Sequence, residues 1–450
     1  MRMLIRDATL VSAGSLGRVV EDGYLRIVDG QITETGKGRV TPEIGEKLIE
    51  GRGRTVFPGL INTHMHLFQS LLKGLGADKQ LYDWLSTMIS PSADELTEDD
   101  CYLGALLGCL EGVKSGTTTF VDFMYAHPRP RLSDAVIRAF EQVGVRGILA
   151  RGISDNAPDA AFEKSWIQPT QVALDDCERL IQEYDGRNLL DIWMAPCTIT
   201  LATPEAFRGV RKLADRYGAR ITAHLSEVPF EVNWAHEHFD CSEMAYLSST
   251  GFLGPDVLAV HCIKVTEQDI EIMANHGVNV SHNPVSNMYL AHGVAPVPQM
   301  IEAGITVALA TDGAASNNSV DYIQDLKFAS LLHKVHTENP EVIDANQVLD
   351  MATIHAAEAI GKADELGSLE VGKRADLFMC DFDHHISGIP CYDPVSALVY
   401  AASSECVRTV MVNGSLVMEE GKVLTIPDYD QVLCQARDAA FDLVRRAGVI

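Results

Sequence analysis

Short apolar runs and stretches with helical periodicity alternate along the middle of the chain. The runs that predict buried strands are residues 56–61, 117–123, 145–153, 190–198, 220–225, 257–265, 278–282 and 305–311. Strands that are apolar throughout are typical of a parallel sheet covered on both faces. Strand–helix alternation repeated eight times predicts a parallel barrel with its helices outside.

The two ends of the chain have a different pattern, with short strands and no long helices between them. Strands are expected at residues 4–11, 24–28, 47–50, 367–370, 375–380, 408–412 and 415–419. Asn413-Gly414 is a typical two-residue hairpin turn, and an amphipathic helix is expected over residues 428–447.

We therefore predict an α/β fold: a distorted (β/α)₈ TIM barrel over residues 58–366, and a small β-sandwich domain formed from both chain ends. Residues 1–57 supply its first part, and residues 367–450 supply the rest together with the C-terminal helix.

Charge and composition exclude several classes of partner. The 450 residues include 62 Asp and Glu against 36 Lys and Arg, a formal net charge of −26. Nucleic acids and anionic membranes need a basic face, so we expect neither as a partner. No apolar run reaches the ~20 residues of a membrane span. The ten cysteines form no C-x-x-C pair, which predicts reduced thiols in a cytoplasmic protein.

Residues that bind metals fall at the ends of several predicted strands. His64 and His66 directly follow the first strand, and residues two apart in extended chain point the same way. The other strand-end candidates are His224, His261, His282 and Asp312. Active sites of such barrels lie where these strand ends meet. Imidazole nitrogens and a carboxylate suit Zn²⁺ or Fe²⁺, so the pattern predicts a hydrolytic metal site.

Several segments together resemble the amidohydrolase superfamily, in the branch of cytosine, guanine and S-adenosylhomocysteine deaminases and s-triazine hydrolases. The matching segments are residues 58–66, 115–119, 224–227, 282–287, 311–318 and 367–377. They span nearly the whole chain. The resemblance implies the distorted barrel and the split β-sandwich. Because relatives are commonly dimers or tetramers, it also implies a homo-oligomer.

The resemblance also implies a ligand set and catalytic roles. His64, His66, His224 and Asp312 would hold one divalent metal ion, with Zn²⁺ preferred and Fe²⁺ as the alternative. Glu227 would be the proton shuttle, His261 would bond the attacking oxygen, and Asp312 would take part in catalysis. Binuclear members carry a bridging lysine on strand four, and residues 191–197 contain none, which points to a single metal.

The same resemblance predicts a hydrolytic deaminase that releases ammonia from an amino-substituted N-heteroaromatic ring. Nucleoside-acting relatives have a ribose-binding glutamate nine residues after the tryptophan that corresponds to Trp84, and this chain has Ala93 there. Those relatives also have a histidine where this chain has Cys197. Both departures weaken the case for an adenosine-type substrate. Residues 66–69 and 195–197 look more like oxidised-guanine and pterin deaminases, so oxidised guanine, a pterin or a similar heterocycle is the expected substrate.

Four further residues are candidates for substrate binding. Gln69 could pair with a ring amide edge, Trp84 could stack on a flat ring, Arg151 could meet a carbonyl or carboxylate, and His282 could touch the substrate. Each also has a structural alternative, such as core packing or an ion pair. His127, His292 and His333 lack strand-end positions and are expected to be structural.

Three other functions stay open at this stage. They are an s-triazine amino- or chlorohydrolase, an S-adenosylhomocysteine or methylthioadenosine deaminase, and a non-catalytic metal-binding protein. Glu227 favours deamination, because an amine leaving group needs a proton.

Overall fold

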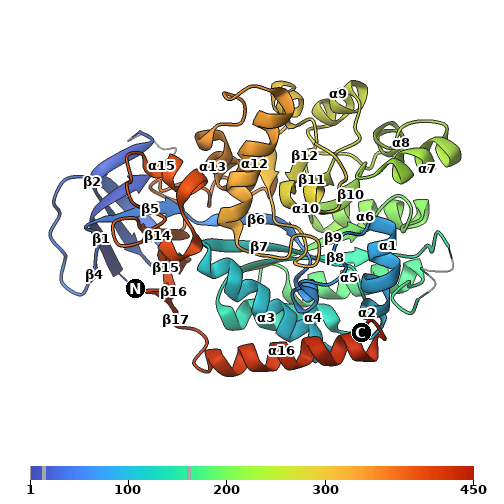
Figure 1. Ribbon diagram of the computed structural model, residues 1–450, viewed down its shortest axis with the longest axis horizontal. Helices are drawn as coiled ribbons and strands as arrows, with labels where there is room; N and C mark the ends of the chain where they lie inside the picture. The colour runs from blue at the N-terminus through green and yellow to red at the C-terminus, as the bar shows by residue number, and fades with distance from the viewer. Residues whose placement is uncertain (1, 13–16, 160–161, 163) are drawn as a thin grey trace.

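The computed structural model describes residues 2–12, 17–159, 162 and 164–450. It contains an eight-stranded sheet and a nine-stranded sheet, which lie side by side in Figure 1. The eight-stranded sheet carries the helices on its outside, and the nine-stranded sheet combines both ends of the chain. The predicted α/β fold, a TIM barrel with a small β unit from both chain ends, is confirmed.

The barrel strands are parallel and follow one another in sequence order around the sheet. They are β6 (Leu60–Met65), β7 (Thr117–Met124), β8 (Arg146–Ile153), β9 (Leu190–Pro196), β10 (Ile221–Leu225), β11 (Val257–His261), β12 (Asn279–His282) and β13 (Val307–Leu309). The first and last strands are joined largely by side chains: Thr63 Oγ1 donates to the Leu309 carbonyl at 2.9 Å. A backbone hydrogen bond from the Asp312 amide to the His64 carbonyl, at 3.1 Å, also joins the first and last strands. Both residues are predicted metal ligands.

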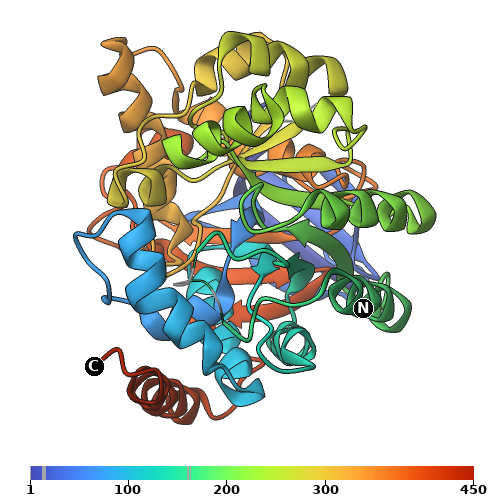
Figure 2. The same cartoon turned by 90° about the vertical axis from the view of Figure 1, so that its right-hand side faces the viewer.

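Helices surround the barrel and cap its ends (Figure 2). They are α1 (Leu81–Trp84), α2 (Ser90–Asp94), α3 (Glu98–Lys114), α4 (Leu132–Val143), α5 (Thr170–Tyr184), α6 (Pro204–Tyr217), α7 (Pro229–Phe239), α8 (Glu243–Ser249), α9 (Glu267–His276), α10 (Pro284–Tyr289), α11 (Val297–Glu302), α12 (Tyr322–Thr337), α13 (Ala345–Ala352), α14 (Ile354–Ala359), α15 (Pro394–Ser396) and α16 (Tyr429–Arg446). Short 3₁₀ or π turns are η1 (Leu67–Leu72), η2 (Leu85–Ile89), η4 (Ala397–Ala401) and η5 (Ser404–Cys406). Capping boxes at Thr97 and Thr266 fix where α3 and α9 begin, because each threonine satisfies backbone donors of the first turn.

The predicted first barrel strand, residues 56–61, is wrong because the chain changes sheet within it. Residues Arg54–Pro58 form β5, which pairs antiparallel with β14 (Leu377–Asp381) in the other sheet. The barrel strand starts only at Leu60, after Gly59. A Cβ at Gly59 would lie 2.2 Å from the Thr118 hydroxyl, so this crossing needs glycine. His64 therefore lies within the strand, and His66 directly follows it.

The nine-stranded sheet has its own small core, formed by residues from both chain ends such as Ile5, Leu25 and Leu377. Its remaining strands are β1 (Arg2–Val11), β2 (Val19–Val28), β3 (Gln31–Lys37), β4 (Lys47–Glu50), β15 (Val407–Val412), β16 (Ser415–Glu419) and β17 (Lys422–Val423). Asn413 and Gly414 have φ values of 48° and 74°, as the predicted hairpin turn requires. Residues 367–370, by contrast, form no strand. The domain boundaries at residues 57 and 366 stay predictions.

The C-terminal helix α16 returns to the barrel and lies along α3 (Figure 1). Arg446 anchors its end by donating to the Asp100 carboxylate at 2.7 Å. All ten cysteines are free thiols. Among the described residues, no helix has the length and apolar character needed to cross a membrane.

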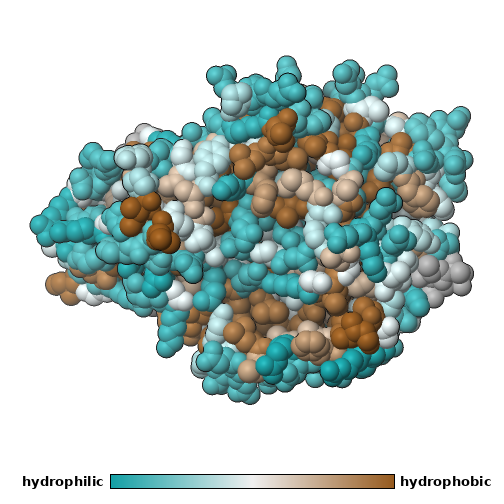
Figure 3. Space-filling view, viewed as in Figure 1, coloured by the Kyte–Doolittle hydropathy of each residue, from teal (hydrophilic) through white to brown (hydrophobic). Residues whose placement is uncertain are grey.

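The surface in the view of Figure 1 is mainly hydrophilic, with separate apolar patches (Figure 3). Phe328, Leu331 and Val335 on α12 are among the exposed apolar residues. The expected homo-oligomer stays a prediction.

Candidate functional site

Four predicted metal ligands converge at the carboxyl end of the barrel strands. His64 Nε2 and His66 Nε2 lie 3.3 Å and 3.4 Å from Asp312 Oδ1. His224 Nε2, at the end of β10, lies 3.3 Å from His66 Nε2. All four side chains are buried. Ligand atoms of His64, His66 and Asp312 lie within 4.8 Å of one another, as do those of His64, His224 and His261.

Outer hydrogen bonds aim two of the imidazoles at the common centre. His66 Nδ1 lies 2.7 Å from the Phe123 carbonyl, and His224 Nδ1 lies 3.0 Å from the Cys197 carbonyl. Each bond leaves Nε2 facing the cluster, the arrangement by which proteins fix a ligating imidazole.

Two hydrogen bonds from neighbouring residues orient the Asp312 carboxylate, whereas the His64 ring has none. The Asp312 carboxylate accepts from Ser286 Oγ at 2.6 Å and from the Gly313 amide at 2.7 Å. Both ring nitrogens of His64 are buried and make no hydrogen bond among the described residues; Nε2 has only the 3.3 Å contact with Asp312 Oδ1. A buried imidazole without a partner costs free energy unless something binds it. The donor set therefore fits a divalent metal ion, with three imidazoles and one carboxylate.

The ionisation states of the three histidines and Asp312 are those that metal binding requires. Burial lowers the pKa of His64 and His224, and it lowers the pKa of His66 to about 4. These imidazoles are thus neutral near pH 7, which is the form that binds a metal. Burial opposes ionisation of Asp312, but its contact with His64 and the nearby imidazoles hold its pKa well below the ordinary value.

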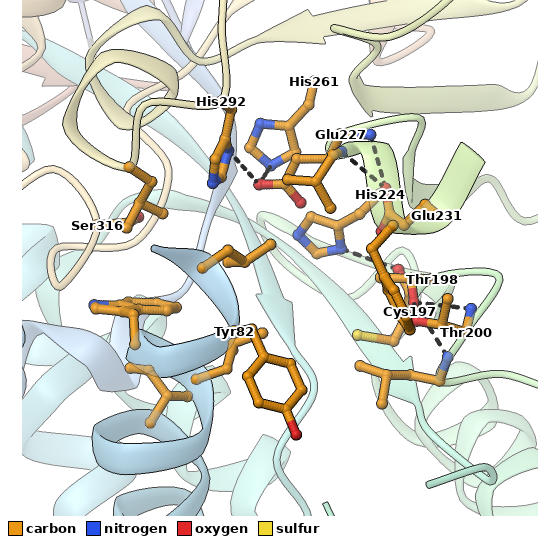
Figure 4. A pocket seen from close by; sticks show the side chains of 18 of the residues that line it. Tyr82, Cys197, Thr198, Thr200, His224, Glu227, Glu231, His261, His292 and Ser316 are labelled. Carbon is orange, nitrogen blue, oxygen red and sulfur yellow. Dashed lines mark hydrogen bonds and ion pairs between the residues drawn. The ribbon is translucent and has the colours of Figure 1, made fainter. Parts of the chain in front are cut away.

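Glu227 occupies the next position outward, beside His261. Glu227 Oε1 lies 3.4 Å from His261 Nε2 and 3.0 Å from His292 Nδ1 (Figure 4). Burial alone would raise the pKa of Glu227, but His261 and His292 outweigh it and hold the pKa at about 2. The Glu227 amide donates to Glu231 Oε2 at 2.7 Å, which fixes the backbone of this segment. Glu227 is thus an ionised carboxylate that faces the cavity and can accept a proton.

Three residues at these strand ends have unusual backbone conformations. The φ values of Ser226, His261 and Asp312 are 51°, 69° and 63°. Positive φ is strained for side-chain-bearing residues and clusters at functional sites. Glu243 holds Ser226 there, accepting from its amide at 2.6 Å and from its hydroxyl at 2.8 Å.

A cavity of about 580 Å³ opens above the cluster. Its inner wall carries His66, Gln69, Tyr125, His224, Glu227, His261, His292 and Asp312. Its outer wall is mainly apolar and carries Leu81, Tyr82, Trp84, Leu85, Ile89, Phe162, Trp166, Leu201 and Phe230. Figure 4 shows Tyr82 and Glu227 on opposite sides of this space. A pocket of this size with a few polar groups suits a small heterocyclic molecule.

Two of the four predicted substrate-binding residues line the cavity. Gln69 lies in η1 and donates from Nε2 to the Tyr125 hydroxyl at 3.0 Å, while its Oε1 has no partner among the described residues. Trp84 lies in α1 and is 4% exposed. Their contact with substrate stays a prediction.

The other two lie away from the cavity. The Arg151 guanidinium donates to the Asp176 carboxylate at 3.1 Å and to Gln168 Oε1 at 2.6 Å. These bonds hold Arg151 against α5 and the preceding loop, and its contact with substrate stays a prediction. His282 Nε2 lies 3.1 Å from His333 Nε2, and both rings are buried. The His282 ring contacts His333 on α12 and is absent from the cavity lining, and its contact with substrate stays a prediction.

Sequence reasoning missed two side chains of the inner region, His292 and Glu231. His292 follows α10 in a loop, outside the strand-end pattern. Glu231 lies four residues after Glu227, in the first turn of α7. That spacing is a sequence signal, because an acidic residue in a first helical turn often caps the preceding backbone. His292 has no comparable signal.

Comparison with known proteins supports the interpretation of the site. Residues 55–417 match the model of the amidohydrolase family. A 5′-deoxyadenosine deaminase of Methanosarcina barkeri is 40% identical over 451 residues, covering 99% of each chain. A 5-methylthioadenosine/S-adenosylhomocysteine deaminase of Syntrophomonas wolfei is 36% identical over 448 residues, covering 99% of this chain and 100% of the relative.

Solved structures agree over nearly the whole length. An adenosine deaminase from Xanthomonas campestris with bound zinc has a TM-score of 0.91 at 26% identity, covering 98% of each chain. The zinc complex of an atrazine chlorohydrolase from Arthrobacter aurescens has a TM-score of 0.90 at 25% identity, covering 97% of this chain and 100% of that one.

These comparisons confirm the prediction of a hydrolase acting on C–N bonds. They do not support oxidised guanine or a pterin as the substrate, and they fit the alternative of an adenosine-type substrate better. Ala93 is buried and does not line the cavity. The family match, the full-length relatives and the His–Asp cluster together show that the chain belongs to the amidohydrolase family.

Proposed function

We propose that this protein is a zinc-dependent deaminase of adenine nucleosides whose 5′ position carries an uncharged group, such as 5′-deoxyadenosine or 5-methylthioadenosine. The proposal rests on full-length similarity to deaminases named for 5′-deoxyadenosine and for 5-methylthioadenosine and S-adenosylhomocysteine. The cavity's apolar outer wall favours those of these nucleosides whose 5′ group is uncharged. An uncharged 5′ group loses little hydration on entering an apolar wall, whereas a charged one is costly to bury.

The polar side chains between the two walls suit the sugar. Ser90, Thr198 and Thr200 line the cavity, and the two threonine hydroxyls lie 2.8 Å apart. Hydroxyl groups both donate and accept, so they can match ribose hydroxyls without a charged partner. They would take the place of the glutamate that this chain lacks at Ala93.

The reaction replaces the amino group on the purine ring with an oxygen from water and releases ammonia. A bound divalent metal ion supplies acidified water at neutral pH. Glu227, ionised and facing the cavity, accepts a proton and delivers it to the ring nitrogen next to the reacting carbon. His261 donates to the oxygen that develops negative charge. Asp312 Oδ2, 3.9 Å from His261 Nε2, accepts the remaining proton and helps pass it to the leaving amine.

A substrate screen tests the proposal directly. Ammonia release is measured for 5′-deoxyadenosine, 5-methylthioadenosine, S-adenosylhomocysteine, adenosine, guanine, 8-oxoguanine, a pterin and an aminotriazine, and chloride release is measured for a chlorotriazine. We expect the highest kcat/KM with 5′-deoxyadenosine or 5-methylthioadenosine. Ammonia from the pterin or 8-oxoguanine alone, or chloride from the chlorotriazine alone, would overturn the proposal.

The Glu227→Gln variant tests the proton shuttle. The amide keeps the size of the side chain but cannot carry the proton, so kcat should fall roughly 10²–10⁴-fold with unchanged zinc content. Full activity in this variant would rule out Glu227 as the shuttle.

A further inference from the structure

His292 contacts Glu227 although it lies outside the strand ends that build the site. It belongs to the loop between α10 and α11, and its side chain is 3% exposed. Its Nδ1 lies 3.0 Å from Glu227 Oε1, and its ring lines the cavity. Figure 4 shows it on the same side of the cavity as Glu227 and His261. Both ring nitrogens are buried and neither makes a hydrogen bond among the described residues; Nδ1 has the 3.0 Å ion-pair contact with Glu227, and Nε2 has no such contact.

One residue of α10 fixes both imidazoles that face Glu227. The Asn287 carbonyl accepts from the His292 amide at 2.9 Å, and Asn287 Oδ1 lies 2.9 Å from His261 Nδ1. Asn287 thus sets the distance between the two rings, and the Glu227 carboxylate lies between them. The placement of His292 is therefore tied to the placement of a residue that the reaction needs.

We propose that His292 is a specificity-determining residue: it holds Glu227 through Nδ1 and accepts a hydrogen bond from the substrate's amino group through Nε2. This inference rests on the proposed function. When the His292 ring is neutral it carries one proton, and the carboxylate beside Nδ1 favours the tautomer with that proton on Nδ1. Nε2 then has a free lone pair, and an N–H donor on the substrate satisfies it.

This arrangement distinguishes an amino leaving group from a halide. An amino group donates an N–H to Nε2, whereas chlorine at the same carbon offers no donor and leaves the nitrogen unpaired. Leaving a buried polar group unpaired is what allows sites to reject analogues that lack the matching group. His292 therefore favours release of ammonia over release of chloride.

The test compares 5′-deoxyadenosine with its 6-chloropurine analogue, in which chlorine replaces the amino group. For wild type and His292→Ala, kcat and KM are measured with the amino nucleoside, and the inhibition constant is measured for the chloro analogue. We expect kcat/KM for the amino nucleoside to fall about 100-fold in His292→Ala, and the inhibition constant of the chloro analogue to change less than about threefold. Equal losses for both compounds, or no loss for either, would overturn the proposal.

The His292→Asn variant separates the two contacts. The asparagine amide nitrogen can replace Nδ1 beside Glu227, but nothing replaces Nε2. Loss of the Glu227 contact should lower kcat, and loss of the substrate contact should raise KM. We therefore expect the asparagine variant to recover most of kcat while its KM stays above the wild-type value. Recovery of KM without kcat would contradict the assignment of the two nitrogens.

Two control experiments test whether the effects are specific to His292 and depend on Glu227. His336→Ala removes an exposed histidine on α12 and should behave as wild type. In a Glu227→Gln background, the alanine change at His292 should cost much less in kcat than it does alone, because the group it positions is already inactive. Wild-type protein that deaminates no purine nucleoside would refute the proposed function, whereas wild-type activity with indifferent His292 variants would refute this inference alone.

Discussion

The inner and outer walls of the cavity are built from different kinds of structure. The inner wall consists mainly of residues at strand ends, such as His224 and His261, whose rings are fixed by hydrogen bonds to neighbouring backbone or side chains. The outer wall consists of large apolar side chains from short helices and loops, such as Tyr82 in α1 and Phe230 in α7. Tyr82 and Phe230 are 47% and 49% exposed, whereas His261 is 1% exposed.

This difference separates the reaction from the choice of substrate. The barrel seam and the strand ends hold the inner groups in one geometry, and that geometry suits hydrolysis of many rings. The outer wall contacts whatever projects from the ring, and loop residues there change without disturbing the barrel. We therefore expect inner substitutions to affect metal binding and kcat, and outer substitutions to affect KM.

The largest effect should come from the inner wall, at Asp312. The Asp312→Asn substitution removes the one carboxylate of the cluster, so we expect loss of bound zinc and a fall in kcat of about 1,000-fold or more. Metal analysis and ammonia release check both. The control is Asp240→Asn, at an exposed position with a φ of 56° that asparagine tolerates. An Asp312→Asn protein with full zinc and full activity would contradict the ligand set.

The sequence predicted the inner wall well because strand ends leave a regular pattern. Each of the four predicted ligands follows or ends an apolar run: His64, His66, His224 and Asp312. The prediction of a parallel barrel was therefore enough to place all four at the carboxyl end of its strands. Even the misplaced first strand preserved this result, because moving its bounds to Leu60–Met65 keeps His64 and His66 at the same end.

The pattern failed where tertiary contacts decide a residue's direction. Arg151 and His282 lie on β8 and β12 as expected, yet Arg151 turns to Asp176 on α5 and His282 to His333 on α12. His292 reaches Glu227 from a loop whose path depends on long-range packing. Strand-end position therefore predicted where a backbone lies, but not which way a long side chain points.

A smaller inner effect is expected at Ser286, which touches Asp312 but not the metal centre. The Ser286→Ala substitution removes the 2.6 Å hydrogen bond to Asp312 Oδ2. Loss of such an outer bond should weaken zinc affinity about 10–100-fold, measured by competition with a chelator. Ser319→Ala is the control, because Ser319 bonds Glu111 and not the cluster. Unchanged zinc affinity would show that the Gly313 amide alone suffices to orient Asp312.

The outer wall should respond through KM, with Trp84 as its clearest test. If Trp84 stacks on the ring, Trp84→Leu should raise KM about 5–50-fold and leave kcat nearly unchanged, because stacking binds the ground and transition states alike. The control is Trp234→Leu, on α7, where the indole stacks on His238 outside the cavity. A fall in kcat at constant KM would place Trp84 among the reacting groups and break the division between the walls.

The smallest effect should appear in stability alone, at Glu243 behind the inner wall. Burial raises the pKa of this carboxyl to about 7, above its ordinary value of 4.5. The folded state therefore holds a proton that the unfolded state has released, so wild-type stability falls as pH rises from about 4.5 to 7.

The Glu243→Gln side chain does not titrate but can still accept hydrogen bonds from Ser226. We expect its unfolding free energy, relative to wild type, to increase by roughly 1–3 kcal/mol between pH 5 and pH 8. Denaturant titrations at the two pH values measure this change, with Glu237→Gln on the exposed side of α7 as the control. A difference that is the same at both pH values would contradict a pKa of about 7 for Glu243.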